Sequence, residues 1–271
     1  MSSSEHRERV EQNEAAAYET LVAAAEHAGQ AGFRSRRIGG ACALLAPSLT
    51  RMVLLNRVIG LGVGEPATED QVAGLAELYA GTNVAWGVEL SPSARPEALA
   101  GWLKAKRLRK GPASAMFIRP CSALPEARTD LQIRAWRPTD GDAGATLAAE
   151  VFQVPPEVRL ILAQLPRQPH WRQWLAFDGD TPVATSLLFI HGDAAWAGWA
   201  ATRPSYRGRG LHTALVSARL RDAADHGCRW VTTDTAIGTS EKPDPSYRNH
   251  LRLGFEVVHV RHTHVAAPRK I

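Results

Sequence analysis

The sequence predicts a mixed α/β fold in two domains, and three observations support this. The chain has 271 residues, 45% of them hydrophobic and 22% charged, which suits two globular domains with apolar cores. Strand-like apolar runs alternate with helical patterns along its length. The order strand, glycine loop, helix, strand, helix, strand occurs at Arg51–Arg119 and again at Trp196–Val265. Such a repeat indicates two related domains, although two α/β halves could also share this order by coincidence.

The first half is interpreted from its helix formers and turn residues. A stretch rich in alanine and glutamate, without glycine or proline, predicts a first helix over Glu5–Ala28. A second helix is expected to start at Thr68-Glu69-Asp70, and a third to follow Pro92 and Pro96 and run to Lys106. Apolar or alternating runs predict strands at Phe33–Ile38, Cys42–Leu45, Arg51–Val58, Val84–Leu90 and Ser114–Arg119.

The second half is expected to begin with a strand at Gln132–Trp136. Two helices should follow, one from Thr139 or Asp140 and one over Glu157–Leu165, because Pro155-Pro156 breaks the chain between them. A turn at Asp178–Thr181 predicts a hairpin. The remaining patterns predict strands at Trp171–Asp178, Pro182–His191, Trp196–Thr202 and Trp230–Thr235, and helices over Leu211–Ala224 and Pro245–Leu253.

The loop between the strand at Trp196–Thr202 and the next helix is the most informative stretch. Such a loop directs unpaired backbone N–H groups and the positive end of a helix dipole at one spot, where a phosphate binds well. Within it, Arg207-Gly208-Arg209-Gly210 combines positive charge with glycines that let the backbone approach an anion closely. An ordinary glycine turn with solvated arginines is the alternative.

The spacing of this loop separates it from two common phosphate loops and relates it to a third. It lacks the three glycines of a dinucleotide fingerprint and the Gly-Lys-Ser/Thr of a Walker loop. The run from Arg207 to His212 resembles the pyrophosphate loop of the GNAT N-acetyltransferase superfamily, Gln/Arg-x-x-Gly-x-Gly/Ala, except that His212 stands where the family prefers glycine or alanine. Arg252-Leu253-Gly254-Phe255 is similar to a second block of that family. The resemblance covers about half the chain, from Leu131 onward.

This resemblance implies a tandem of two GNAT-like domains, each a mixed, mostly antiparallel sheet flanked by helices. Residues 1–120 would be a degenerate copy, 121–130 a linker and 131–271 the catalytic domain that binds acetyl-CoA. The first copy has Gly60, Gly62 and Gly64 but neither arginine, and Glu65 would repel a phosphate. We therefore expect that it binds no cofactor.

The resemblance also assigns the residues that would bind acetyl-CoA. The pantetheine arm would enter between the strands Trp196–Thr202 and Trp230–Thr235, where backbone N–H groups act as donors to the thioester oxygen. Ser246 and Asn249 would bond the cofactor arm, unless they are a helix cap or turn residues. The full expected set is Ala200, Ala201, Thr202, Arg207, Gly208, Arg209, Gly210, Leu211, His212, Ser246 and Asn249.

Three residues are candidates for proton transfer. His250 occupies the position where the family often keeps a tyrosine acid, and Tyr247 lies one turn earlier on the same helix. A histidine that titrates near neutrality could protonate the departing thiolate. The central strand carries no glutamate, so Asp234 and Glu150 are the nearest acidic candidates for a base. Both could equally be solvent-facing charges, and a base acting through water stays open.

The function predicted from these residues is an N-acyltransferase that moves an acetyl group from acetyl-CoA to a primary amine of a small molecule or peptide. A protein that binds CoA without turnover is the main alternative, and a nucleic-acid-binding module is disfavoured, because the net charge of +5 includes no long basic run. We expect a cytoplasmic protein with no metal and no membrane partner, and keep a homodimer open. Cys42, Cys121 and Cys228 are scattered and fit a reducing compartment.

Overall fold

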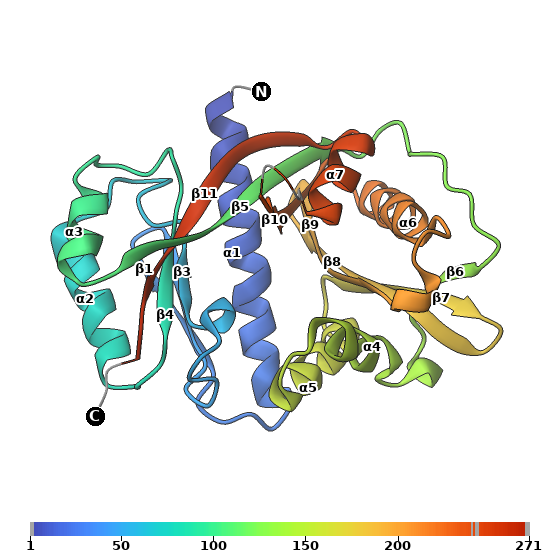
Figure 1. Ribbon diagram of the computed structural model, residues 1–271, viewed down its shortest axis with the longest axis horizontal. Helices are drawn as coiled ribbons and strands as arrows, with labels where there is room; N and C mark the ends of the chain where they lie inside the picture. Colours follow the sequence, from blue (N-terminus) through green and yellow to red (C-terminus); the bar gives the residue numbers. More distant parts are fainter. Residues whose placement is uncertain (1–2, 240, 242–243, 269–271) are drawn as a thin grey trace. The chain divides into compact units, whose positions relative to one another are not determined.

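The computed structural model describes residues 3–239, 241 and 244–268, which form two compact units (Figure 1). The first unit takes in residues 1–23, 31–117 and 234–271, and the second takes in 24–30 and 118–233. The chain passes from one unit to the other within helix α1 (Ser3–His27) and strands β5 (Arg109–Pro120) and β10 (Trp230–Ala236). Each unit contains a sheet with flanking helices, which confirms the predicted fold class.

The sheet of the first unit has the strand order β1-β2-β3-β4-β11-β5. Its pairs are antiparallel between β1 and β2, β2 and β3, and β4 and β11, and parallel between β3 and β4. The last strand of the chain therefore completes a sheet built mainly from the first half, with His262 opposite Leu90 and Ala266 opposite Trp86. The compact units do not follow chain order, and the division at 120 and 131 stays a prediction. The remaining elements of this unit are β1 (Arg34–Ile38), β2 (Ala41–Leu45), β3 (Arg57–Ile59), α2 (Glu69–Ala80), β4 (Trp86–Leu90), α3 (Leu99–Ala105), α7 (Pro245–Arg252) and β11 (Glu256–Ala266).

Helices α2 and α3 cover one face of this sheet with an apolar core. Helix α2 starts where predicted, because Thr68 caps it and forms a reciprocal capping box with Gln71. Its inward residues pack with those of α3 and the strands in one cluster of buried side chains. That cluster includes Ala43, Leu45, Val58, Val72, Leu75, Tyr79, Trp86, Val88, Leu99 and Leu103.

The predicted strand Arg51–Val58 is wrong. Residues Val53–Leu55 form a 3₁₀ turn, and only Arg57–Ile59 is a strand. The reason lies in Asn56, whose buried side chain accepts from the N–H of Ala46 and donates to three carbonyl groups, those of Ala46, Leu49 and Met52. An asparagine that bonds nearby backbone in this way offers an alternative to the ladder of a sheet.

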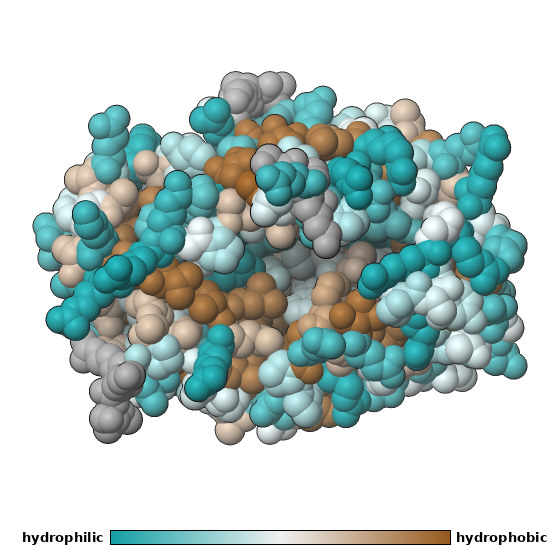
Figure 2. All heavy atoms as spheres, in the orientation of Figure 1, coloured by the Kyte–Doolittle hydropathy of each residue, from teal (hydrophilic) through white to brown (hydrophobic). Residues whose placement is uncertain are grey.

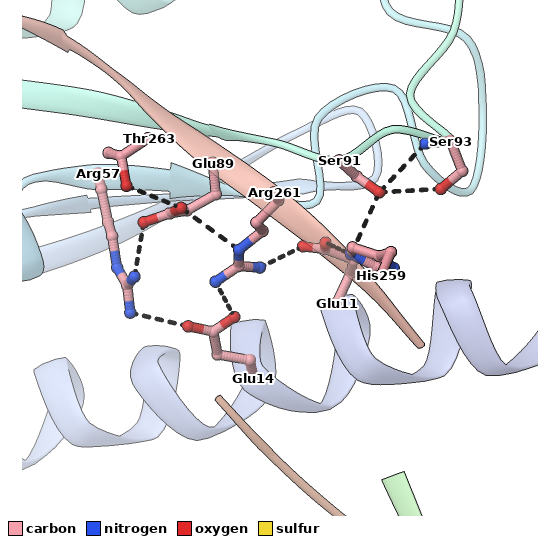
Figure 3. Close-up of polar contacts among 9 residues, drawn as sticks. All are labelled: Glu11, Glu14, Arg57, Glu89, Ser91, Ser93, His259, Arg261 and Thr263. Atoms are coloured by element: carbon pink, nitrogen blue, oxygen red, sulfur yellow. Dashed lines mark hydrogen bonds and ion pairs between the residues drawn. The ribbon is translucent and has the colours of Figure 1, made fainter. Parts of the chain in front are cut away.

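The opposite face of this sheet meets α1 through a buried ionic network (Figure 3). Arg57 of β3 donates to Glu14 at 2.9 Å and to Glu89 of β4 at 2.7 Å. Arg261 of β11 donates to Glu11 at 2.5 Å and also bonds Glu14. All five side chains are buried, so three carboxyl groups surround two guanidinium groups out of contact with water.

The pKa of Glu14 is raised mainly by burial of its carboxyl group in this network. Burial raises it to about 7, and the nearby charges of Arg261 and Arg57 offset the rise only in part. The pKa of Glu89 is lowered, because the attraction of Arg261 and Arg57 and two hydrogen bonds outweigh its burial.

Strand β11 keeps apolar residues on the surface at its start, although it buries charged residues further along. Figure 2 shows hydrophobic side chains gathered there, and Val257 and Val260 are both among the exposed large hydrophobic residues. His259 and Arg261 are buried against α1, where the Nε2 atom of His259 lies 2.9 Å from Glu11. The pattern of apolar and polar residues along β11 therefore does not indicate which of its two faces is buried.

The second unit has the strand order β10-β9-β8-β7-β6. The pairs from β9 to β6 are antiparallel, while β9 and β10 run parallel. The hairpin of β7 and β8 confirms the one predicted around Asp178–Thr181, and the helix expected from Thr139 or Asp140 begins only at Ala143, after a 3₁₀ turn at Pro138–Asp140. The elements of this unit are β6 (Gln132–Ala135), α4 (Ala143–Phe152), α5 (Pro156–Gln164), β7 (Trp171–Asp178), β8 (Thr181–His191), β9 (Ala194–Thr202) and α6 (Leu211–Asp225).

Candidate active site

The glycine loop lies in the second unit between β9 and α6. A 3₁₀ turn at Pro204–Tyr206 leads into it, and Gly208 and Gly210 both have positive φ, +81° and +75°. Gly210 occupies the N-cap position of α6, and no side chain caps the helix there. Since glycine has no side chain, the residue at the N-cap position cannot cap the helix, and a helix start of this kind favours an anion.

The two glycines are needed for different reasons. A Cβ atom on Gly210 would lie 2.1 Å from the carbonyl oxygen of Arg128, so this glycine is required by its own neighbouring chain. A Cβ atom on Gly208 would meet nothing within 4 Å. Of the two, Gly208 thus faces open space, where the side chain of a larger residue would obstruct a ligand without a clash with the chain, although its positive φ would still be strained.

The arginines near the loop are also not equivalent. Arg209 is held by Asp130, lies 3.9 Å from Asp178 and stacks over Tyr206 at 5.4 Å. Arg203 forms an ion pair with Glu150 at 3.1 Å. Arg207 is exposed and forms no ion pair with the residues that the structure describes. Of the two arginines predicted to attract phosphate, Arg207 is therefore the one available for it.

Strand β9 has a free edge beside the loop. Its parallel pairing with β10 covers three pairs, from Trp230 opposite Ala194 to Thr232 opposite Trp196. Beyond Trp196, no further pair joins the two strands within the described residues. Ala200, Ala201 and Thr202 lie in this second half of β9, so their backbone groups on that side are not used by β10.

The same half of β9 contains a bulge that sequence reasoning missed. Thr185 lies opposite Ala201 and Leu187 opposite Gly198, so β9 has one more residue than β8 between these pairs. Trp199, in the bulge, has φ of +51°, a left-handed conformation that is unusual for a bulky residue. Ser186, opposite the bulge, is fully buried, and its hydroxyl has no hydrogen-bond partner within the described chain.

Beneath the bulge, Arg219 of α6 is buried with no carboxylate partner among the described residues. Its Nη1 donates to the carbonyl of Leu187 at 3.4 Å, and its Nε donates to that of Leu215 at 3.3 Å. Burial lowers its pKa to about 10. The guanidinium thus links α6 to β8 next to the bulge through this hydrogen bond.

The candidate acids lie on α7, in the first unit. The imidazole of His250 is 6% exposed and packs between Phe117 at 5.3 Å and Phe255 at 5.1 Å. Tyr247 is half-buried and packs edge-on against Phe117 at 5.5 Å. Asp244 caps the helix by accepting from the N–H of Ser246 at 2.7 Å. The aromatic surroundings make His250 part of a core, and they leave Tyr247 the more accessible of the two.

The other predicted residues of the first unit are Asn249 and Asp234. The side-chain oxygen of Asn249 accepts from Arg252 at 3.0 Å. Asp234 is half-buried on β10, near the ionic network, where its charge adds to the effect of burial in raising the pKa of Glu14. The loop residues from Arg207 to His212 and the donors on β9 all lie in the second unit, whereas Asp234, Ser246, Tyr247, Asn249 and His250 all lie in the first.

Comparison with known proteins relates part of the chain to one family. The profile of the acetyltransferase (GNAT) family matches residues 136–255. These residues match the GNAT acetyltransferase domain. The matched range contains the loop, β9 and α7, and the family supports acyl transfer as the class of reaction. A comparison with curated proteins gives no match.

Solved structures similar to the chain extend this likeness beyond the GNAT domain. A GCN5-related N-acetyltransferase from Kribbella flavida is 19% identical, with a TM-score of 0.64 over 91% of this chain and 96% of that one. A tandem GNAT protein from the clavulanic acid biosynthesis pathway is 16% identical, with a TM-score of 0.61 over 87% and 82%. A GCN5-related N-acetyltransferase from Sphaerobacter thermophilus is 18% identical, with a TM-score of 0.61 over 85% and 81%. At these identities the likeness shows the fold.

Two further kinds of feature are absent from the described residues. They contain no group of three or more histidine, cysteine or acidic side chains placed to hold a metal ion. None of their helices has the length and apolar character needed to cross a bilayer.

Proposed function

We propose that this protein is an N-acetyltransferase that transfers an acetyl group from acetyl-CoA to a primary amine of a small molecule or peptide. The observation that carries the proposal is the N-terminus of α6, where the N-cap residue is a glycine in the left-handed conformation, next to the half of β9 that β10 does not pair with among the described residues. Backbone N–H groups, with the guanidinium of Arg207 beside them, are suited to a pyrophosphate. Free backbone groups of a strand are suited to the amides of a pantetheine arm and to the thioester oxygen.

The reaction is a direct transfer. The amine nitrogen attacks the thioester carbonyl carbon, the C–N bond forms, the C–S bond breaks, and CoA leaves as a thiolate. The amine gives up a proton, for which Asp234 is the proposed acceptor, and the thiolate takes one. We assign that second proton to Tyr247 ahead of His250, because His250 is enclosed by Phe117 and Phe255.

We further propose that residues 1–120 bind no CoA. The corresponding loop of this half is closed by its own chain, since the N–H of Arg95 donates to Gly62 at 2.8 Å and the guanidinium of Arg95 donates to Gly64 at 3.2 Å. A Cβ atom on Gly62 would lie 2.5 Å from the carbonyl oxygen of Arg95. Gly62 thus makes room for the backbone of the segment around Arg95, which leaves no space for a phosphate. One acetyl-CoA per chain is therefore expected.

The experiment is CoA release from acetyl-CoA against a panel of amino acids, polyamines, aminoglycosides and peptides with free N-termini. Amine-dependent release supports the proposal. Tight binding of acetyl-CoA without release with any amine would support the alternative, a CoA-binding protein without turnover. Comparing Tyr247→Phe with His250→Ala then identifies the acid, because a positioned acid contributes roughly a hundred-fold or more to kcat.

A further inference from the structure

An exposed aromatic pair lies at the bulge of β9. Phe152 ends α4 and is 44% exposed, although phenylalanine is one of the residues most often buried. Its ring meets the indole of Trp199 edge to face, with 5.7 Å between the centroids and 83° between the planes. Both residues belong to the second unit, so their contact is internal to it.

Trp199 adopts a conformation that a bulky side chain avoids unless its surroundings enforce it. Its φ of +51° is the only positive value of a non-glycine residue in the described part of β9. Such strain concentrates at functional sites, and it here turns the side chain of Trp199 toward Phe152. In contrast, Trp171 and Trp196 are buried and meet edge to face in the core, with 6.3 Å between their ring centroids.

The indole of Trp199 also carries an unused donor. Its Nε1 atom is inaccessible to solvent and has no hydrogen-bond partner among the residues that the structure describes. A buried donor without a partner is costly, and most buried indole N–H groups find one. Because this N–H is closed to solvent, a ligand would bond it only after the partly exposed ring of Phe152 beside it moves aside.

The charges around this pair do not suit a polycation. Glu150, two residues before Phe152 on α4, is engaged by Arg203 at 3.1 Å. Trp199 lies in the half of β9 that β10 does not pair with among the described residues, which is where the proposed function places the thioester. The surface beside the reacting carbonyl is therefore apolar and aromatic, with one donor.

We propose that Phe152 and Trp199 form the acceptor subsite and select an amine that carries an aromatic group and an oxygen able to accept a hydrogen bond from the indole. This inference rests on the proposed function. It narrows the acceptor from any primary amine to an amine that carries an aromatic group and an oxygen acceptor. The ring of the acceptor would complete the aromatic cluster, and its carbonyl oxygen would satisfy Nε1 of Trp199. Small alkylamines and polyamines would be poor acceptors.

The test is kcat/KM with acetyl-CoA for ethylamine, putrescine, 2-phenylethylamine and L-phenylalaninamide. We expect 2-phenylethylamine to exceed ethylamine roughly ten-fold or more, as filling an apolar pocket typically gives. Phe152→Leu and Phe152→Ala should lower this ratio stepwise. Trp199→Phe, which keeps a ring but removes the N–H, should lower the advantage of L-phenylalaninamide over 2-phenylethylamine. Leu124→Ala is the matched control, since Leu124 is also an exposed apolar residue but lies in the segment before β6.

The outcomes separate this inference from the proposed function. Turnover of all four amines with ratios that Phe152→Leu and Trp199→Phe do not change would overturn the subsite and leave the transferase standing. Absence of turnover with every amine would overturn the transferase instead. In that case, saturation-transfer NMR of L-phenylalaninamide with the CoA-loaded protein decides the subsite: a signal from the ligand ring that disappears in Phe152→Ala supports it, and no binding refutes it.

Discussion

Separate replacement of Gly208 and Gly210 by alanine distinguishes a glycine that the ligand needs from one that the fold needs. Both residues have positive φ, so alanine at either site costs about 1–2 kcal/mol of stability from the backbone alone. At Gly210 the added methyl would also lie 2.1 Å from the carbonyl oxygen of Arg128. Overpacking of this kind costs typically about 1–3 kcal/mol more, so the two variants should differ in stability by that amount.

The assays are thermal unfolding and calorimetric titration with acetyl-CoA. At about 2–4 °C per kcal/mol for a chain of this size class, Gly208→Ala should melt only a few degrees below the wild type, and Gly210→Ala distinctly lower. Gly208→Ala should nevertheless weaken acetyl-CoA binding about ten-fold or more, because its methyl group enters the open space at the helix N-terminus. Equal melting temperatures would refute the clash with Arg128. Undiminished affinity in Gly208→Ala would remove the loop from the binding site.

Three further predictions concern charges and the last strand. Because the pKa of Glu14 is raised from 4.5 to about 7, the native state holds a proton that the unfolded chain has lost, so stability should fall by up to about 3 kcal/mol as the pH rises from 4.5 to 7. Denaturant titrations across that range measure it. Asp130→Asn, which frees Arg209, should strengthen acetyl-CoA binding a few-fold at low salt in calorimetry. A fragment starting at Leu131 should be poorly soluble by size-exclusion chromatography, because β11 then lacks β4 and Arg261 lacks its acidic partners on α1.

A control variant or a contradicting result tests each of these three predictions. Glu14→Gln should flatten the pH dependence, and an equally steep fall in this variant would show that another group is responsible. Weaker binding in Asp130→Asn would mean that the ion pair orders the loop and does not compete with phosphate. A soluble, fully active fragment from Leu131 would show that the pairing of β11 with β4 is dispensable.

Local signals made much of the fold predictable. The capping box of Thr68 and Gln71, the turn at Asp178–Thr181 and the long helix of α1 each depend on neighbours in sequence, and each lies where expected. The strand at Arg51–Val58 failed because the buried side chain of Asn56 bonds backbone that lies up to ten residues away. A pattern of apolar residues carries no information on such a bond.

The candidate site shows the same division between local and distant causes. The glycine loop could be predicted, because its chemistry is contained in a few consecutive residues. That Arg209 is neutralised by Asp130, and that Gly210 faces Arg128, depends on a segment some 80 residues earlier in the chain. The bulge at Trp199 arises from the register of β8 against β9, which no single strand encodes. Glu11 and Glu14 of α1 are buried, but their spacing continues that of Glu5 and Glu8, so the sequence contains no sign that these two glutamates join the network.

Transfer of labelled acetyl from acetyl-CoA to an amine, followed by mass spectrometry of the amine, tests the central proposal most directly. The wild-type protein should give a product heavier by one labelled acetyl group, with one CoA released for each product formed. Gly208→Ala should lower the yield at limiting acetyl-CoA and recover it when acetyl-CoA is raised. If the protein binds labelled acetyl-CoA but transfers its acetyl group to no amine of the panel, that result would contradict the proposed function.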